Sequence, residues 1–437
     1  MPRYSPDMNA QSARGRVFLF LQGPHGPFFY RLGQILQTAG GTVWRVGFNA
    51  GDRAFWRDRS TYIPYRGKPE DWGETLAHLL DDKAVTDIIL YGDTRGIHTK
   101  AIEQARARGI TIHVFEEGYL RPYWATYERD GSNGNSRLID MTLPMMEAAL
   151  DRSDIEAPLP PAHWGDTREH IWYGAIYHGC ILFLNWTYRG FRSHREVSVA
   201  REFRLYLMRL LLLPTHAVDR FRATRQILRG GFPYHLVLLQ LAHDSNFRNH
   251  SPFASIDEFL ETVVDGFAAG APIHHHLVFK AHPLEDGRVP LRPKIKAIAK
   301  ARGIENRVHF VRGGKLARLL NDVRSTVTVN STAGQQALWR GIPLKAFGRA
   351  VYAKDAFVSD QPLRSFFAAP MRPDARAYRE FRRYLLETSQ IPGSFYSARG
   401  RRQLLRLVVD MILSPCDPYD ALVRGAATPR QHLSAVE

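Results

Sequence analysis

Two adjacent acids stand at a point in the sequence where a cleft carboxylate is expected. Glu116 and Glu117 directly follow Ile110–Phe115, an apolar run that predicts a buried strand, and Gly118 permits a sharp turn behind them. Neighbouring side chains at a strand end diverge, so at most one carboxylate need face a cleft, where it can act as a base or as a nucleophile. Arg121 can hold an anionic substrate group through a bidentate contact. The alternative is an ordinary helix N-terminus, where acids favour the helix dipole.

A second polar cluster ends the predicted strand His276–Phe279 and contains Lys280, His282 and Pro283. Pro283 fixes the chain direction, the imidazole of His282 can donate to a phosphate oxygen, and Lys280 adds positive charge. Without this context His282 is more often structural. The histidine run at 274–276 suggests a metal, but three consecutive residues cannot point to one face of a strand, so we expect no metal and no other cofactor.

A third cluster lies between the predicted strand Val327–Asn330 and the predicted helix Gln335–Trp339. Small and hydroxyl side chains, including Ser331 and Thr332, occupy this junction. Backbone N–H groups and the helix dipole at such a junction favour an anion. The alternative is a plain Ser/Thr N-cap, which is common.

Composition narrows the classes of function without choosing one. The chain has 437 residues, with 59 Lys plus Arg against 43 Asp plus Glu and a formal net charge of +16, which favours an anionic partner such as nucleic acid, phospholipid or a phosphorylated substrate. Two cysteines exclude a disulfide scaffold and a Cys-rich zinc site. The sequence contains no P-loop, G-x-G-x-x-G, G-x-S-x-G or H-E-x-x-H motif and no Asp-x-Asp pair.

Alternation of short apolar runs with helical patterns predicts two doubly wound α/β domains of the Rossmann type. A ligand is then expected in a cleft between them, at the carboxyl ends of the strands. We expect an N-terminal domain at 1–142, a helical insertion at 143–231, a C-terminal domain at 232–390, and a basic amphipathic helix with its tail at 391–437.

The insertion and the tail are rich in arginine and aromatic residues. We expect the aromatic side chains of the insertion to pack against the neighbouring domain; these are Trp172, Tyr173, Tyr177, Phe183, Trp186, Tyr188 and Phe191. The stretch Ile171–Thr187 is too short and too interrupted to span a membrane, and the apolar run near the start is shorter than a signal-peptide core. Ala398–Leu413 predicts an amphipathic basic helix.

The three clusters together resemble bacterial GT-B glycosyltransferases that use CMP-activated acidic sugars. The flanking sequence is similar, over about residues 17–350, to capsular polysaccharide synthesis and export proteins of the KpsS/LipB type. The segments that carry this resemblance are Phe20–Pro24, Gly26–Phe29, Phe48–Asp52, Tyr91–Asp93, Phe115–Pro122, Gln240 with Asp244-Ser245, His250–Phe253 and Val327–Gly334.

The resemblance implies a retaining β-Kdo transferase that takes Kdo from CMP-Kdo and builds the Kdo linker for capsule on a phosphatidylglycerol-type lipid. Glu117 then corresponds to the catalytic acid of the family, with Glu116 as a helper. His282, Ser331 and Thr332 correspond to the positions that contact the CMP phosphate. Related Kdo transferases carry Asp where this chain has Glu117, which leaves nucleophile and base both open. The expected substrate-binding residues are Gln22, Gly23, Asn49, Asp93, Arg121, Gln240, Asp244, Ser245, Lys280, Pro283, Gly313, Asn330, Ser331 and Thr332, with His282 counted among the catalytic ones.

A cytoplasmic protein bound peripherally to the inner face of the bacterial inner membrane is expected, because a basic surface suits anionic lipid. Other capsule assembly proteins are possible partners. Three alternatives remain: a CMP-sialic-acid-dependent sialyltransferase, a non-catalytic export scaffold and a nucleic-acid binder. The last has no recognisable helix-turn-helix, RRM or zinc-finger pattern, so we expect no nucleic-acid partner.

Overall fold

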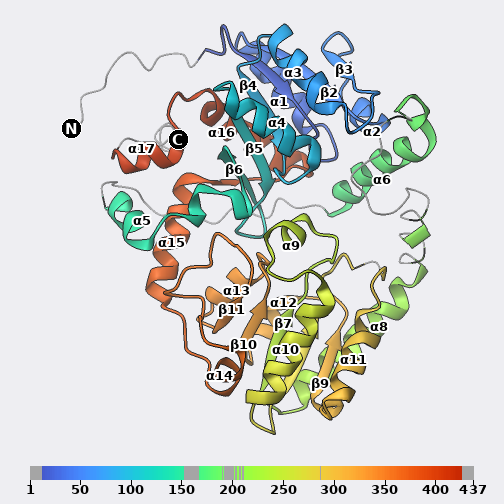
Figure 1. Ribbon diagram of the computed structural model, residues 1–437, viewed down its shortest axis with the longest axis vertical. Helices are drawn as coiled ribbons and strands as arrows, with labels where there is room; N and C mark the ends of the chain where they lie inside the picture. The colour runs from blue at the N-terminus through green and yellow to red at the C-terminus, as the bar shows by residue number, and fades with distance from the viewer. Residues whose placement is uncertain are drawn as a thin grey trace. The chain divides into compact units, whose positions relative to one another are not determined.

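The computed structural model describes residues 12–151, 167–188, 190, 201, 204–205, 208, 211–285 and 287–425 (Figure 1). The chain forms two compact units. Unit 1 comprises Met1–Arg137, Pro144–Arg195 and Arg383–Glu437, and unit 2 comprises Leu138–Leu143 and Glu196–Arg382. The expected insertion is therefore divided between the units, and the expected separate tail belongs to unit 1.

Unit 1 is built on a seven-stranded sheet in the order β12-β6-β5-β4-β1-β2-β3. The five strands from β5 to β3 run parallel, whereas β6 is antiparallel to both β5 and β12. The strands are β1 (Val17–Phe20), β2 (Thr42–Gly47), β3 (Tyr62–Pro64), β4 (Asp87–Tyr91), β5 (Thr111–Glu117), β6 (Trp124–Arg129) and β12 (Gln390–Pro392).

Helices cover both faces of this sheet because alternate strand residues on each face are apolar. One core, with Phe18, Phe20 and Phe115, packs on α1 and α16, and the other, with Leu19, Ile88 and Val114, packs on α3 and α4. The helices of unit 1 are α1 (Phe28–Thr38), α2 (Ala50–Ala54), α3 (Trp72–Asp82), α4 (Gly96–Ala107), α5 (Leu143–Leu150, whose first residue is in unit 2), α6 (Thr167–Leu184), α16 (Ala398–Leu413) and α17 (Pro418–Val423), with short 3-10 turns at Asn133–Asn135, Arg137–Ile139 and Asn185–Tyr188.

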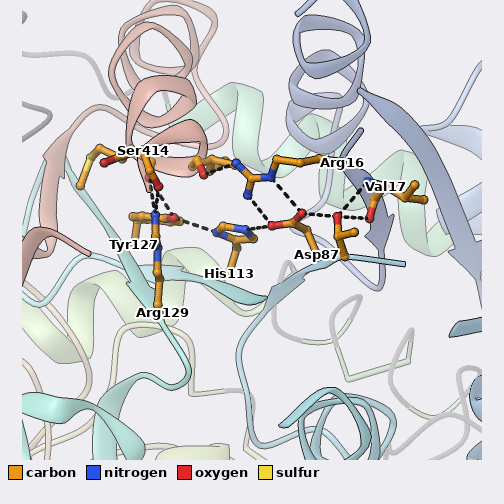
Figure 2. Close-up of polar contacts among 10 residues, drawn as sticks. Arg16, Val17, Asp87, His113, Tyr127, Arg129 and Ser414 are labelled. Atoms are coloured by element: carbon orange, nitrogen blue, oxygen red, sulfur yellow. Dashed lines mark hydrogen bonds and ion pairs between the residues drawn. The ribbon is translucent and has the colours of Figure 1, made fainter. Parts of the chain in front are cut away.

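The basic C-terminal helix is an integral part of unit 1. Its apolar face, including Leu404, Val408 and Ile412, is buried in the core beside α1. Figure 2 shows the polar network that fixes its end: Arg129 donates to the carbonyl of Ser414 at 2.6 Å. The same network continues through Tyr127, His113 and Asp87 to Arg16, whose Nη1 donates to Ile412 O at 3.1 Å. This face of the helix is therefore not a membrane-binding surface.

Unit 2 is built on a five-stranded parallel sheet in the order β11-β10-β7-β8-β9. Its strands are β7 (Tyr234–Leu238), β8 (His276–Lys280), β9 (Val308–Val311), β10 (Val323–Thr328) and β11 (Leu344–Ala346). Its helices are α8 (Leu213–Arg229), α9 (Ser245–His250), α10 (Ile256–Gly270), α11 (Leu291–Ala301), α12 (Leu316–Leu320), α13 (Gly334–Leu338) and α14 (Leu363–Ala368), with a 3-10 turn at Glu305–Arg307; α15 (Ala375–Thr388) begins in unit 2 and ends in unit 1.

Both sheets confirm the expected α/β class with two doubly wound Rossmann-type units, while a cleft between the units stays a prediction. In the described part of the expected insertion there are helices and no strand. Its aromatic side chains divide: Tyr177 and Tyr188 are buried as expected, whereas Trp172, Phe183 and Trp186 are exposed, which corrects the expectation for those three. Phe191 lies outside the described residues. Among the helices of the described residues, none is long and apolar enough to cross a membrane.

Candidate functional site

The two adjacent acids lie at the carboxyl end of β5, within the strand rather than after it. Glu116 pairs with Thr126 and Glu117 with Ala125 of β6, so the chain turns back as a hairpin and no helix begins there. The interpretation as a helix N-terminus is therefore wrong. Gly118 serves this hairpin: a Cβ at that position would lie 2.3 Å from the carbonyl oxygen of Trp124.

Glu116 makes two hydrogen bonds at the end of β5. Its carboxylate oxygens accept from the backbone N–H of Glu117 at 2.9 Å and from Nδ2 of Asn133 at 3.4 Å. Burial raises the pKa of the Glu116 carboxyl to about 7, because two hydrogen bonds do not offset the loss of water and the nearby charges of Glu117 and Asp93. Near neutral pH this side chain therefore changes between a neutral donor and an anion.

Glu117 faces a group of aromatic side chains that the sequence argument missed. The hydroxyl of Tyr91, the last residue of β4, donates to Oε1 of Glu117 at 3.0 Å. Burial, followed by the charge of Glu117, raises the pKa of the Tyr396 hydroxyl, and His170 of α6 stacks on the Tyr396 ring with centroids 3.9 Å apart. Arg401 of α16 donates to the carbonyl oxygen of Tyr396 at 2.8 Å, so the C-terminal helix positions this wall of the site.

The loops that follow β1, β2 and β4 are joined by a buried polar network. Gln22 accepts from Arg95 at 2.8 Å, which bridges the switch point between β1 and β4. Gln22 and Asn49 both donate to the hydroxyl of Tyr177 of α6, at 3.1 and 2.9 Å. These two predicted substrate-binding residues are thus buried partners of the insertion helix, which closes over this edge of the sheet.

The other predicted residues of unit 1 have mainly local contacts. Asp93 is buried and accepts from the backbone N–H of Ser132 at 2.8 Å and from Asn135 at 3.1 Å, which fixes the loop after β6. Gly23 leaves room for the ring of Phe29, which would lie 2.5 Å from a Cβ. Arg121 is exposed and donates to the carbonyl of Gly118 at 3.2 Å, with its charge near Glu116.

In unit 2 the switch point lies between β7 and β10, and two predicted residues bridge it. Gln240 Nε2 donates to Oδ1 of Asn330 at 2.8 Å, and the backbone N–H of Asn330 donates back to Gln240 at 3.1 Å. Asn330 also donates to the carbonyl of Asn246 at 2.9 Å. Asp244 caps α9, whose first residue is Ser245, by accepting from the same Asn246 at 3.0 Å. These amides hold the loops of this sheet edge together.

Lys280 is a buried cation at the carboxyl end of β8. It is 6% exposed, and its one described polar contact is with the carbonyl oxygen of Ala281 at 3.5 Å. Within the described part of the chain no carboxylate lies at ion-pair distance from it. Burial and the charge of Arg220 lower its pKa to about 8. A buried ammonium with so little compensation is suited to an anionic ligand.

The remaining predicted residues share this sheet edge, because all five strands of unit 2 are parallel. His282 is half-buried and its Nδ1 accepts from the backbone N–H of Leu284 at 3.1 Å. Gly313 has a φ of 63°, a conformation that favours glycine, and a Cβ there would be in ordinary contact with the Cα of Pro283 at 3.5 Å. The turns that follow β8 and β9 therefore lie next to each other.

Ser331 and Thr332 lie half-buried in the turn after β10. Ser331 Oγ accepts from the backbone N–H of Ala333 at 3.2 Å, and its carbonyl accepts from the hydroxyl of Tyr352 at 2.6 Å. The helix that follows, α13, has five residues. The hydroxyl groups rather than a long helix dipole are then the features that could serve an anion here.

The structure thus groups the predicted residues on the carboxyl edges of two sheets, with Glu116 and Glu117 in unit 1 and Lys280 and His282 in unit 2. It adds Tyr91, Tyr177, His170 and Tyr396 to the site. Of these, Tyr91 had a signal in the sequence, because it begins one of the segments that carry the family resemblance. In the part of the chain that the structure describes, no group of three or more His, Cys, Asp or Glu side chains could hold a metal ion.

The fold and the site define a two-unit, doubly wound α/β protein with polar residues at the carboxyl ends of its strands. Comparison with known proteins then shows the family to which the chain belongs. The model of the capsule polysaccharide biosynthesis protein family matches residues 86–396, which include the acid pair of unit 1 and Lys280, His282 and Ser331 of unit 2. The chain is 31% identical over 397 residues to the capsule polysaccharide export protein KpsS of Escherichia coli, covering 87% of this chain and 97% of that protein. It is also 31% identical to the capsule polysaccharide modification protein LipB of Neisseria meningitidis serogroup A, covering 87% of this chain and 91% of that protein.

The chain therefore belongs to the capsule polysaccharide biosynthesis protein family, and its KpsS/LipB-type character is confirmed. Among solved structures it is similar to the β-Kdo 2,7 transferase of KpsC from Thermosulfurimonas dismutans, with a TM-score of 0.41 and 12% identity over 84% of this chain and 89% of that one.

Proposed function

We propose that this chain is a capsule-related glycosyltransferase that transfers β-Kdo from CMP-Kdo to a phosphatidylglycerol-type lipid. The observation that carries the proposal is Lys280, a buried cation with no ion-pair partner among the described residues, at the carboxyl ends of the strands, where a doubly wound unit binds its ligand. The acid pair on β5 of the other unit supplies the second element, and membership of a capsule family supplies the context.

In the proposed reaction the CMP phosphate departs with the electron pair of the bond to the anomeric carbon of Kdo. Lys280, with His282 and Ser331, stabilises the charge that develops on that phosphate, so no metal is needed. This arrangement requires the two units to face one another, as the sequence analysis predicts.

Two roles remain possible for Glu117. As a nucleophile its carboxylate bonds to the anomeric carbon as CMP leaves, and the acceptor hydroxyl then displaces it with loss of a proton, which gives net retention. As a base it takes the acceptor proton in a single displacement, which gives inversion. The family resemblance favours retention. The hydrogen bond from Tyr91 keeps the carboxylate oriented in either case.

Incubation with CMP-Kdo and a lyso-phosphatidylglycerol analogue, followed by mass spectrometry of the lipid, tests the proposal. We expect the mass of the lipid to increase by one or more Kdo residues, in the presence of EDTA as in its absence, with release of an equal amount of CMP. A parallel reaction with CMP-sialic acid tests the sialyltransferase alternative. No transfer from either donor would contradict the proposal.

A non-catalytic role in export is the second candidate, and it rests on the description of the Escherichia coli relative as an export protein. It is distinguished by the absence of CMP release in the same assay.

Under either function we place the protein on the inner face of the inner membrane, bound peripherally. The exposed aromatic residues Trp172, Phe183 and Trp186 support contact with a lipid interface.

A further inference from the structure

A groove of about 630 Å³ lies in unit 2 between α8 and the segment that joins β9 to α12. Seven of its lining residues come from α8, at the three- and four-residue spacing of a single helix face, from Ala217 to Arg229. The others are Gly313, Gly314 and three residues of 315–319. All of its lining residues belong to unit 2, whereas the acid pair belongs to unit 1.

Positive charge is concentrated in this groove. Five of the lining side chains are basic and none is acidic; the basic ones are Arg220, Arg225, Arg229, Lys315 and Arg318. In the described part of the chain none of the five makes a hydrogen bond or an ion pair through its side chain. By contrast, Asp219, the one acid of α8, pairs with Arg292 of α11 at 3.1 Å. Like charges held together without partners favour an anionic surface or ligand.

Apolar side chains alternate with these cations. Phe221 and Leu228 line the groove and remain 60% and 39% exposed. Before them, Leu211, Leu212 and Leu213 are exposed as well. A small phosphate ion or a nucleotide phosphate would neutralise the arginines but leave these side chains in water. A phospholipid surface satisfies both, because its headgroups accept from arginine while its acyl boundary takes up apolar groups.

We propose that this basic groove, together with the exposed side of α8, docks the protein on an anionic phospholipid surface. The phosphodiester headgroups accept hydrogen bonds from the groove arginines, and Phe221 and Leu228 enter the boundary of the acyl chains. Gly313 lines the groove and lies in contact range of Pro283, so the docking face adjoins the cluster proposed to hold the donor phosphate. The inference goes beyond sugar transfer and rests on the proposed function only for the choice of phosphatidylglycerol as the test lipid.

Vesicle flotation with the full chain tests the docking face. We expect binding to phosphatidylcholine vesicles that contain phosphatidylglycerol, weakened by salt, and little binding to phosphatidylcholine alone. Arg225→Glu changes the local charge by two and should lower the partition coefficient about 25-fold. Lys296→Glu makes the same charge change at an exposed position of α11, outside the groove, and should have much less effect. Phe221→Ser should lower partition about fivefold or more at unchanged net charge.

Three results would overturn the inference. The first is an equal loss of vesicle binding for Arg225→Glu and Lys296→Glu, and the second is equal binding to neutral and anionic vesicles. The third is unchanged vesicle binding of Phe221→Ser together with displacement of that variant from the vesicles by inorganic phosphate at constant ionic strength. The last would identify a site for small anions. Melting temperatures establish that the variants are folded. Because flotation uses no donor, a protein that floats but transfers no sugar would refute the proposed function alone, and one that transfers to a soluble lipid analogue without floating would refute docking alone.

Discussion

Replacing Lys280 with methionine should raise the unfolding free energy of the ligand-free protein and lower its affinity for the nucleotide. Methionine keeps most of the aliphatic stem in its buried position at the end of β8 but removes the charge. If the ammonium serves only the fold, its removal should lower stability. If it is kept for an anionic ligand, as we propose, the free protein tolerates an unfavourable buried charge that the ligand compensates.

The pKa of Lys280 gives the size of this effect. Burial and Arg220 lower it from 10.5 to about 8, which corresponds to about 3 kcal/mol of unfavourable free energy in the charged folded state at pH 7. The unfolded chain binds this proton more tightly than the folded chain. Wild-type stability should therefore rise with pH between about 8 and 10.5, and Lys280→Met should raise the unfolding free energy at pH 7 by about 1–3 kcal/mol.

The same substitution should weaken CMP binding about 10- to 100-fold, the range for losing one charge-assisted contact of about 1.5–3 kcal/mol. Thermal unfolding and calorimetric CMP titration measure the two effects side by side. Lys296→Met, at an exposed position of α11, is the matched control and should change neither. A Lys280→Met protein that melts at a lower temperature and binds CMP normally would refute the argument and assign the residue to the fold.

Four further predictions concern the acids, the phosphate contacts and the membrane. Glu117→Ala should remove nearly all transfer, and Glu117→Gln almost as much, while calorimetric CMP affinity is retained; near wild-type turnover would pass the role to Glu116. Glu116→Gln should remove the change in the transfer rate near pH 7, since burial raises the Glu116 pKa to about 7 and the wild-type carboxyl loses its proton there; an unchanged pH profile would exclude this group. His282→Ala and Ser331→Ala should each lower CMP affinity about 10- to 100-fold, and unchanged calorimetric titrations of both would place the nucleotide elsewhere. High salt should release the protein from membranes, and retention through salt and alkaline carbonate washes would contradict peripheral binding.

Sequence patterns predicted the helices and strands whose own residues show the expected periodicity of apolar side chains. Ala398–Leu413 was predicted with the observed bounds of α16, and His276–Phe279 was predicted one residue shorter than β8. Strand β6 was missed because Trp124–Arg129 mixes aromatic, small and charged residues, and its place in the sheet comes from the hairpin with β5. Strand β12 has three residues and pairs with a partner more than 250 positions earlier, which no local pattern reveals.

The site was predictable where strand ends determine it and not where long-range packing does. The positions of Lys280 and Glu117 follow from buried strands that end in polar residues. The contact of Tyr396 with His170 depends on a C-terminal segment that returns to unit 1. An amphipathic basic helix would place Arg401 on its charged face, yet this side chain is 2% exposed and donates to the backbone carbonyls of Phe395 and Tyr396. An amphipathic pattern gives the apolar face of a helix but not what covers the other side.

The charges of the two clusters fit the separation of charge in glycosyl transfer from a sugar nucleotide. In the proposed reaction, positive charge grows at the anomeric carbon and negative charge on the departing phosphate as the bond between them breaks. Glu117 is suited to the first and Lys280 to the second. A second ionised carboxylate beside Glu117 would repel the carboxylate of an acidic donor sugar. The raised pKa of Glu116 lets that neighbour stay neutral on the acidic side of pH 7, so the pair can present one negative charge instead of two.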